Sequence, residues 1–129
     1  MDFKSIPVLR IFDIVEAKAF YLDYLGMTLD WEHKFDDESP TYMQVSRGPM
    51  VFHLTQHYGD CSPGAKLFIH VSDLETLYAE LDEKNHSYNR PCIDIAPWGD
   101  RHFTVVDPFS NKILFNEIKW LTEKIKVNN

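Results

Sequence analysis

The sequence contains no apolar run close to the ~20 residues that a membrane-spanning helix requires. Its first residues, Met1-Asp2-Phe3-Lys4-Ser5, lack the apolar core of a secretory signal peptide. These two absences favour a cytoplasmic protein. Basic residues are also scarce, because 13 Lys and Arg against 20 Asp and Glu leave a net charge of -7. Such a charge repels phosphate backbones, argues against nucleic-acid binding and favours encounter with cationic ligands.

Cysteine is almost absent, and no catalytic motif is evident. The two cysteines, Cys61 and Cys92, form no Cys-x-x-Cys pair, so we interpret both as ordinary reduced thiols. No Gly-x-Ser-x-Gly motif or phosphate-binding loop occurs, and Cys61 has no evident base. The sequence therefore gives no positive sign of catalysis, and we predict neither catalytic residues nor a cofactor.

What the chain does contain is an internal repeat. Its 129 residues, 44% of them hydrophobic, are enough for one domain with a core. Ile11-Phe12-Asp13-Ile14 aligns with Val71-Ser72-Asp73-Leu74 at an offset of 60 residues. Each half, about 5–56 and 65–118, then reads as strand, helix and three strands. The pattern predicts an α+β fold of two tandem βαβββ units.

One amphipathic helix is expected in each half. The first follows Asp13, a plausible N-cap, with Glu16 three residues on, and stops at Gly26. The second follows Ser72-Asp73, where Glu75 would complete a capping box. The apolar residues at helical spacing are Ile14, Ala17, Tyr21, Tyr24 and Leu25 in the first helix and Leu74, Leu77, Tyr78 and Leu81 in the second.

Strands are predicted from alternation and from turn residues. Residues 28–35 alternate with period two and place Trp31, His33 and Phe35 on one face, before a turn at residues 36–40. The remaining predicted strands are 41–47 and 50–56, which form a hairpin around Gly48-Pro49, and 66–71, 91–95, 101–106 and 112–118. Residues 57–64 form a linker. In the tail, 119–129, Leu121 and Ile125 fit either a short amphipathic helix or a frayed end.

The stretch from Pro97 to Pro108 is the most informative one, because a Pro-Trp-Gly turn leads into an alternating strand that ends at Asp-Pro. With the repeat, it resembles bleomycin-resistance proteins of the glyoxalase (vicinal oxygen chelate) superfamily over roughly residues 6–118. The resemblance implies that the two units form a cupped mixed sheet around a ligand cavity. The chain departs from the family at residues 107–111, where Asp-Pro-Phe-Ser-Asn replaces Asp-Pro-Asp-Gly-Asn. This change alters the turn, and we expect Phe109 to add an exposed ring.

The resemblance also locates four positions that hold metal ligands in metal-dependent members. They fall on Ile6, His53, Lys66 and Leu114, and the repeat supports this because the pairs differ by 60 and 61 residues. Ile and Leu offer no donor, and a Lys ammonium repels a cation, whereas a divalent metal needs several N or O ligands. Only His53 remains as a ligand candidate, so we predict no metal of the family type.

Other histidines do not supply an alternative metal site. His53 and His57 have i, i+4 spacing, but on a strand this separates them by about 13 Å at ~3.3 Å per residue. We interpret His33, His70, His86 and His102 as packing, hydrogen-bonded or exposed residues. Lys66 near His53 would act as a general acid and base only if the cavity of the cupped sheet excludes water, which lowers the pKa of a lysine. The simpler interpretation is that Lys66 binds an anionic group or pairs with a carboxylate.

The binding interpretation draws on aromatic rings and negative charge. In the family, rings hold the flat part of a bleomycin-type antibiotic and acidic surface receives its cationic tail; stacking adds roughly 0.5–1.5 kcal/mol per pair. Trp98 matches the turn Trp and Trp31 the second-strand ring, although Trp31 also fits a core position. The full set of predicted ligand-binding residues is Trp98, Trp31, Phe35, Tyr42, Gly99, His53 and Lys66. Asp30, Glu32, Asp36, Asp37 and Glu38 are a steering field or an ordinary solvated face.

These features lead to one main functional hypothesis and two alternatives. The main one is a metal-free protein that sequesters a bleomycin-type antibiotic in a groove between the subunits of a homodimer, as the resemblance implies. Pro7 is compatible with a strand edge or a segment that crosses to the partner. The alternatives are a lyase, isomerase or dioxygenase of the superfamily, and a binder of another metabolite.

Overall fold

The two halves of the chain fold with the same topology. The structure, a computed structural model, describes residues 1–117 and divides into two units. The first unit contains residues 1–65 together with Asp107–Asn111, and the second contains Lys66–Val106 and the segment from Lys112 onward. The repeat predicted from the offset of 60 residues therefore corresponds to the two units, apart from the short turn at 107–111.

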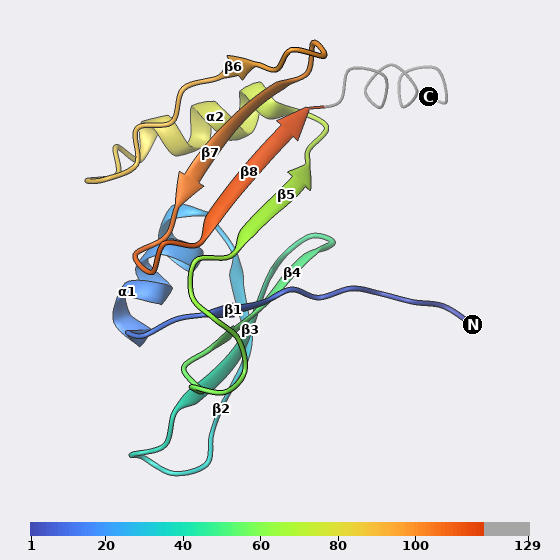
Figure 1. Ribbon diagram of the computed structural model, residues 1–129. Helices are drawn as coiled ribbons and strands as arrows, with labels where there is room; N and C mark the ends of the chain where they lie inside the picture. Colours follow the sequence, from blue (N-terminus) through green and yellow to red (C-terminus); the bar gives the residue numbers. More distant parts are fainter. Residues whose placement is uncertain (118–129) are drawn as a thin grey trace. The chain divides into compact units, whose positions relative to one another are not determined.

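The first unit is a four-stranded mixed sheet with one helical segment. Its strands are β1 (Val8–Arg10), β2 (Thr28–Lys34), β3 (Thr41–Arg47) and β4 (Met50–Thr55), and its helix α1 (Ile14–Lys18) continues as the π-helix η1 (Ala19–Tyr24). The strand order is β1-β4-β3-β2, with β1 parallel to β4 and the other pairs antiparallel (Figure 1). The hairpin at Gly48 is confirmed, and this residue has a φ of +57°, which suits glycine.

The second unit repeats this arrangement. It consists of β5 (Lys66–His70), α2 (Leu74–Glu83), β6 (Asp94–Ile95), β7 (Arg101–Val106) and β8 (Lys112–Glu117). The strand order β5-β8-β7-β6 matches that of the first unit, again with one parallel pair, β5 and β8 (Figure 1). The predicted α+β class with two βαβββ units is confirmed. The tail prediction for Leu121 and Ile125 lies outside the described residues.

Both helices begin at an aspartate cap. The Asp13 carboxylate accepts a hydrogen bond from the Glu16 amide at 2.8 Å, and Asp73 accepts one from the Thr76 amide at 3.1 Å. The capping box predicted at Glu75 is wrong, because Asp73 is the cap and Thr76 lies three residues after it. The Glu75 carboxylate instead lies 2.6 Å from Nη1 of Arg101.

Alternation along the strands of the first unit separates a core face from a polar face. Met43, Val45, Phe52 and Leu54 are buried on the core face. Tyr42, Gln44 and His53 alternate with them, and the register pairs Gln44 with His53. In β2 a bulge between Leu29 and Trp31 shifts the register, so that Trp31 pairs with Gln44 and joins the polar face.

The turn Asp107–Asn111 belongs to the first unit, although it connects β7 to β8. Asn111 Nδ2 donates to the Arg10 carbonyl at 3.0 Å, and its Oδ1 accepts from the Ala65 amide. The ring of Phe109 packs edge-on against Phe12, with 5.9 Å between centroids. Phe109 is only 7% exposed, so the prediction of an exposed ring is wrong, because the turn folds onto the first unit.

Candidate functional site

Three rings on the polar face of the first unit form one cluster. The ring of Trp31 lies nearly parallel to that of Tyr42, with 5.9 Å between centroids and 10° between planes. The His53 ring lies edge-on to both, at 5.3 Å from Trp31 and 5.2 Å from Tyr42. Trp31 is 43% exposed, so part of this aromatic cluster is open to solvent.

A chain of hydrogen bonds fixes the orientation of His53. The Asp30 carboxylate accepts from Gln44 Nε2 at 3.0 Å, and hydrogen bonds from Ser46 and Gln44 hold its pKa below the usual value. The Gln44 Oε1 atom therefore faces His53 Nε2, at 2.9 Å, and Nε2 donates to it. The His53 Nδ1 atom then accepts from the Tyr42 hydroxyl at 2.7 Å. Gln44, His53 and Tyr42 are thus each held by a neighbouring side chain.

This chain bears directly on the four mapped metal positions. His53 is the one position with a donor side chain for a metal, and both its ring nitrogens are engaged in hydrogen bonds. Ile6 and Leu114 supply no donor, and Lys66 is exposed at the start of β5. Among residues 1–117, no three His, Cys, Asp or Glu side chains are placed to hold a metal ion. The residues present do not fit a metal of the kind these positions hold elsewhere.

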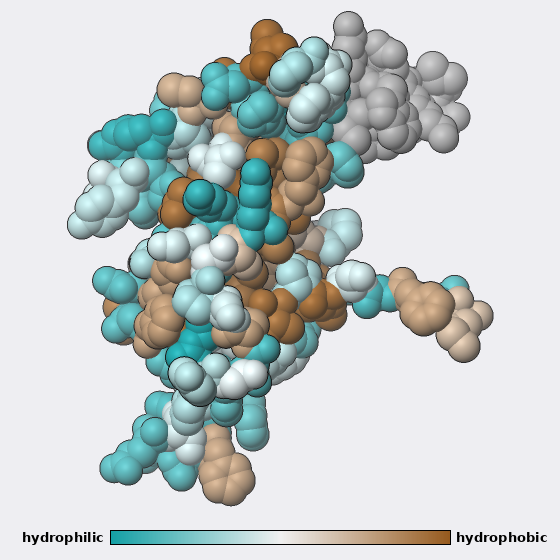
Figure 2. Space-filling model, in the orientation of Figure 1, coloured by the Kyte–Doolittle hydropathy of each residue, from teal (hydrophilic) through white to brown (hydrophobic). Residues whose placement is uncertain are grey.

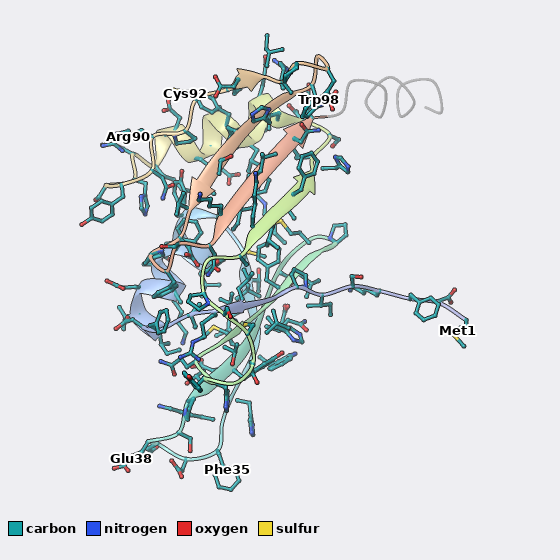
Figure 3. All side chains as sticks on the ribbon, viewed as in Figure 1. Met1, Phe35, Glu38, Arg90, Cys92 and Trp98 are labelled. Atoms are coloured by element: carbon teal, nitrogen blue, oxygen red, sulfur yellow. The ribbon has the colours of Figure 1, made fainter. Side chains whose placement is uncertain are left out.

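Trp98 lies in the second unit on a closed turn before β7. The turn is held by hydrogen bonds from the Ala96 amide to the Asp100 carbonyl, at 2.7 Å, and from the Gly99 amide to the Ala96 carbonyl. Gly99 has a φ of +99°, which a residue with a side chain rarely adopts. The Trp98 ring is 68% exposed, and its Nε1 donates to Asp100 Oδ2 at 3.0 Å (Figure 3). The turn presents an aromatic ring to solvent in a fixed direction.

The other predicted site residues are not gathered into the aromatic cluster. Phe35 falls after the last residue of β2 and is 86% exposed, and Figure 3 shows it pointing away from the strands. Hydrophilic side chains surround this end of the hairpin of β2 and β3 (Figure 2). Lys66, Trp98 and Gly99 belong to the second unit. The structure therefore brings together Trp31, Tyr42 and His53 from the predicted set.

The acidic residues around β2 have different environments. Glu32 pairs with Lys18 at 2.9 Å, which offsets its charge. Asp36 accepts from the Glu38 amide and the Ser39 hydroxyl within the turn, and these bonds lower its pKa. Asp30 lies at the bulge and stays ionised beside the aromatic cluster. Of this group, Asp30 is the carboxylate that the structure ties to the rings.

Sequence reasoning missed Gln44, which orients His53, and Asp100, which holds Trp98, and it named Asp30 only as one of several acidic residues near the rings. The alternation of β3 was a usable signal for Gln44, because it places this residue on the face of Tyr42. The contact between Asp30 and Gln44 had no such signal, since the bulge at Asp30 depends on strand pairing rather than on local sequence.

The fold and the sequence define the class of protein. A family profile described as glyoxalase superfamily protein matches residues 2–120. The chain belongs to the glyoxalase superfamily, and its fold is that of the glyoxalase and bleomycin-resistance proteins. No curated protein matches the chain.

Several solved structures share this fold at low sequence identity. A bleomycin-binding protein crystallised with bleomycin is 21% identical, with a TM-score of 0.67 over 92% of this chain and 100% of that one. A bleomycin resistance determinant encoded on transposon Tn5 is 18% identical, with a TM-score of 0.68 over 92% and 99%. A putative glyoxalase family protein from Bacillus anthracis is 23% identical, with a TM-score of 0.61 over 92% and 98%. At these identities the similarity concerns the fold.

Within residues 1–117, every helix is too short or too polar to cross a lipid bilayer.

Proposed function

We propose that the protein binds a flat, cationic small molecule without a catalytic metal, and that a bleomycin-type antibiotic is the first candidate ligand. The observation that carries this proposal is the aromatic cluster, in which the exposed Trp31 ring is stacked on Tyr42 and contacted edge-on by His53. A rigid ring offers stacking surface at little entropic cost. Trp98 provides a second oriented ring in the second unit.

The negative charge near the aromatic cluster favours a cationic ligand over an anionic one. Asp30 is ionised and accepts from Gln44, whose Oε1 atom contacts His53. A cation next to Trp31 gains attraction from the ring face and from this carboxylate. The net charge of -7 adds long-range attraction that salt weakens.

The superfamily's enzymes are the main alternative. An enzyme of the metal-dependent kind predicts stoichiometric metal and turnover, and the engagement of both His53 nitrogens argues against it. A protein that binds a different metabolite would use the same rings, because stacking on an aromatic ring does not distinguish one planar ligand from another. These alternatives are separated by metal analysis and by the choice of titrant.

We further propose that the protein is a homodimer and works in the cytoplasm. His53 donates its amide to the Pro7 carbonyl, and no element precedes β1 in residues 1–7, where Phe3 is 88% exposed. This segment is free to contact a second copy. Cys61 and Cys92 are free thiols, which suits a reducing compartment. Sedimentation equilibrium tests the dimer, and a monomer at micromolar concentration would contradict it.

The test is a calorimetric titration of metal-analysed protein with metal-free bleomycin, followed in parallel by tryptophan fluorescence. We expect saturable binding near one drug per chain, quenching of Trp emission and no bound metal. Variants that keep one tryptophan, W98F/W120F and W31F/W120F, assign the quenching to Trp31 or Trp98. Absence of binding would remove the bleomycin assignment, and stoichiometric metal would favour an enzyme.

A further inference from the structure

Arg10 is a buried cation in the first unit. Its side chain is part of a residue only 9% exposed, its Nη1 donates to the Gln56 carbonyl at 2.7 Å, and its guanidinium lies 4.8 Å from the centre of the Phe12 ring. No carboxylate among residues 1–117 lies within ion-pair distance of it. A guanidinium has five N–H donors, and a buried charge is costly unless an opposite charge accompanies it. The charge of Arg10 is therefore only partly compensated.

A cavity of about 520 Å³ opens beside this side chain. Among residues 1–117 its wall is lined by Arg10, Phe12, Tyr58, Gly59, Cys61, Ser62 and Pro63, of which Arg10 alone carries a formal charge. Two of the lining residues carry aromatic rings, Phe12 and Tyr58, and both are exposed. The cavity combines one buried cation, apolar rings and enough room for a small organic molecule.

A second cavity also borders Arg10, and the charges in the two walls indicate which cavity suits an anion. The smaller cavity, about 270 Å³, shares Arg10 and Phe12 but is also lined by Glu38. A carboxylate there would repel an anion, whereas none of the described residues that line the larger cavity is acidic. The nearby Asp60 is not in that wall, and its carboxylate accepts a hydrogen bond from the Thr55 hydroxyl. An anion that pairs with Arg10 is therefore expected on the side of Cys61.

We propose that this cavity, called the Arg10 cavity below, is a binding site for a small aromatic carboxylate. The carboxylate accepts from the guanidinium N–H groups that Gln56 does not use, and the aromatic ring packs against Phe12 and Tyr58. This goes beyond the function proposed above, because the ligand has the opposite charge and occupies a cavity built by the linker between the two repeats.

Cys61 is a natural reporter for this site because it lines the cavity. Burial and the neighbouring Asp60 raise the pKa of the Cys61 thiol, and Arg10 partly offsets this increase. A carboxylate bound to Arg10 would neutralise that offset and cover the sulfur. Both effects reduce the thiolate available for alkylation. Cys92 is exposed in the second unit and is an internal control.

The experiment measures the rates of alkylation of Cys61 and Cys92 by iodoacetamide, using mass spectrometry, with benzoate as the probe. Benzamide has the same ring without the charge and is the matched control. We expect benzoate to slow the reaction of Cys61 saturably and several-fold, with half-saturation at about 1 mM or below, and to leave Cys92 unchanged. The proposal is overturned if benzoate has no effect, or if benzamide protects Cys61 equally well.

Two variants test whether benzoate binds in the Arg10 cavity, and a third serves as their control. Gly59 lines the cavity, a Cβ added there meets no atom within 4 Å, and the backbone is not left-handed, so Gly59→Leu adds bulk at the cavity wall without backbone strain. It should abolish protection by benzoate while Arg10 is kept. Arg10→Met removes the charge and should also abolish protection, whereas Lys34→Met removes an exposed cation of β2 and should retain it. If Arg10→Met does not fold, Gly59→Leu still decides, and full protection in Gly59→Leu contradicts the proposal.

Discussion

The buried hydroxyl of Tyr21 donates a hydrogen bond of 2.7 Å to Oδ2 of Asp107, which lies 86 residues further along the chain. Burial, followed by the negative charge of Asp107, raises the pKa of Tyr21 well above its usual value, so the hydroxyl stays protonated. The other carboxylate oxygen accepts from the amides of Phe109 and Asn111. One aspartate thus both shapes the turn at 107–111 and attaches it to η1.

Replacing Tyr21 with Phe should destabilise the protein by about 1.5–3 kcal/mol, which is typical for loss of a hydrogen bond to a charged group. The free energy of unfolding in urea measures this. Tyr78→Phe is the matched control, because Tyr78 packs against Phe103 and no hydrogen bond of its hydroxyl is present in the described part of the chain. We expect the control to change stability by less than about 0.5 kcal/mol. Equal effects of the two substitutions would contradict the role given to the Asp107 contact.

In the neutral imidazole of His53 the proton should lie on Nε2. The order of donors from Tyr42 to Asp30 requires this tautomer, because the Asp30 carboxylate accepts from Gln44. Long-range ¹H–¹⁵N correlation spectra distinguish a protonated Nε2 from a protonated Nδ1. In Gln44→Leu the Nε2 partner is lost, and the two tautomers should become mixed. A wild-type spectrum with the proton on Nδ1 would reverse the chain and contradict our assignment.

The local parts of this fold were predictable from sequence because their causes are local. Asp13 and Asp73 begin helices through bonds to amides three residues away, and Gly48 closes a two-residue hairpin connection. The π-helix η1 was not predicted, because a regular apolar spacing does not distinguish it from an α-helix. The burial of Phe109 was missed for another reason, since it depends on contact with Phe12, almost a hundred residues earlier.

The aromatic residues of the candidate site were predictable from the sequence, but the hydrogen bonds around them and the buried charge of Arg10 were not. Trp31, Tyr42 and His53 were each identified, and strand pairing then brought them within stacking distance. Arg10 gave no signal, because in the sequence it is one basic residue beside apolar ones. Its burial depends on how residues 56–63 fold back over β1, which neither periodicity nor composition determines.

Trp98→Ala should weaken bleomycin binding by about 0.5–1.5 kcal/mol without unfolding the protein, because the ring is exposed and contributes stacking rather than core packing. Calorimetry gives the change in affinity and circular dichroism checks the fold. Phe35→Ala is the control, since Phe35 is also exposed but lies beyond β2. Unchanged affinity in Trp98→Ala would remove Trp98 from the site, and a loss in Phe35→Ala would return Phe35 to it.

Lys66→Met should leave bleomycin affinity within about twofold of wild type if Lys66 is a solvated charge. Lys66 is exposed, pairs in register with Lys112, and has no ion-pair partner among the described residues. Removing one of two adjacent cations should favour a cationic ligand slightly, and this effect should fade in high salt. The same calorimetric titration at two salt concentrations measures it. A large loss of affinity would instead show that Lys66 contacts the ligand or orders the residues around it.

Ser110→Gly should stabilise the protein by about 0.5–1 kcal/mol. Ser110 has a φ of +71°, a left-handed conformation that costs a residue with a side chain about 1 kcal/mol or more, and its position in the turn is the one where the family carries glycine. The added freedom of glycine in the unfolded chain offsets part of this gain. Asn85→Gly is the control, because Asn85, with a φ of +50° after α2, belongs to a residue type that tolerates this conformation. Thermal and urea denaturation of both variants measure the difference. A loss of stability in Ser110→Gly would mean that the Ser110 side chain contributes more to the turn than its backbone strain costs.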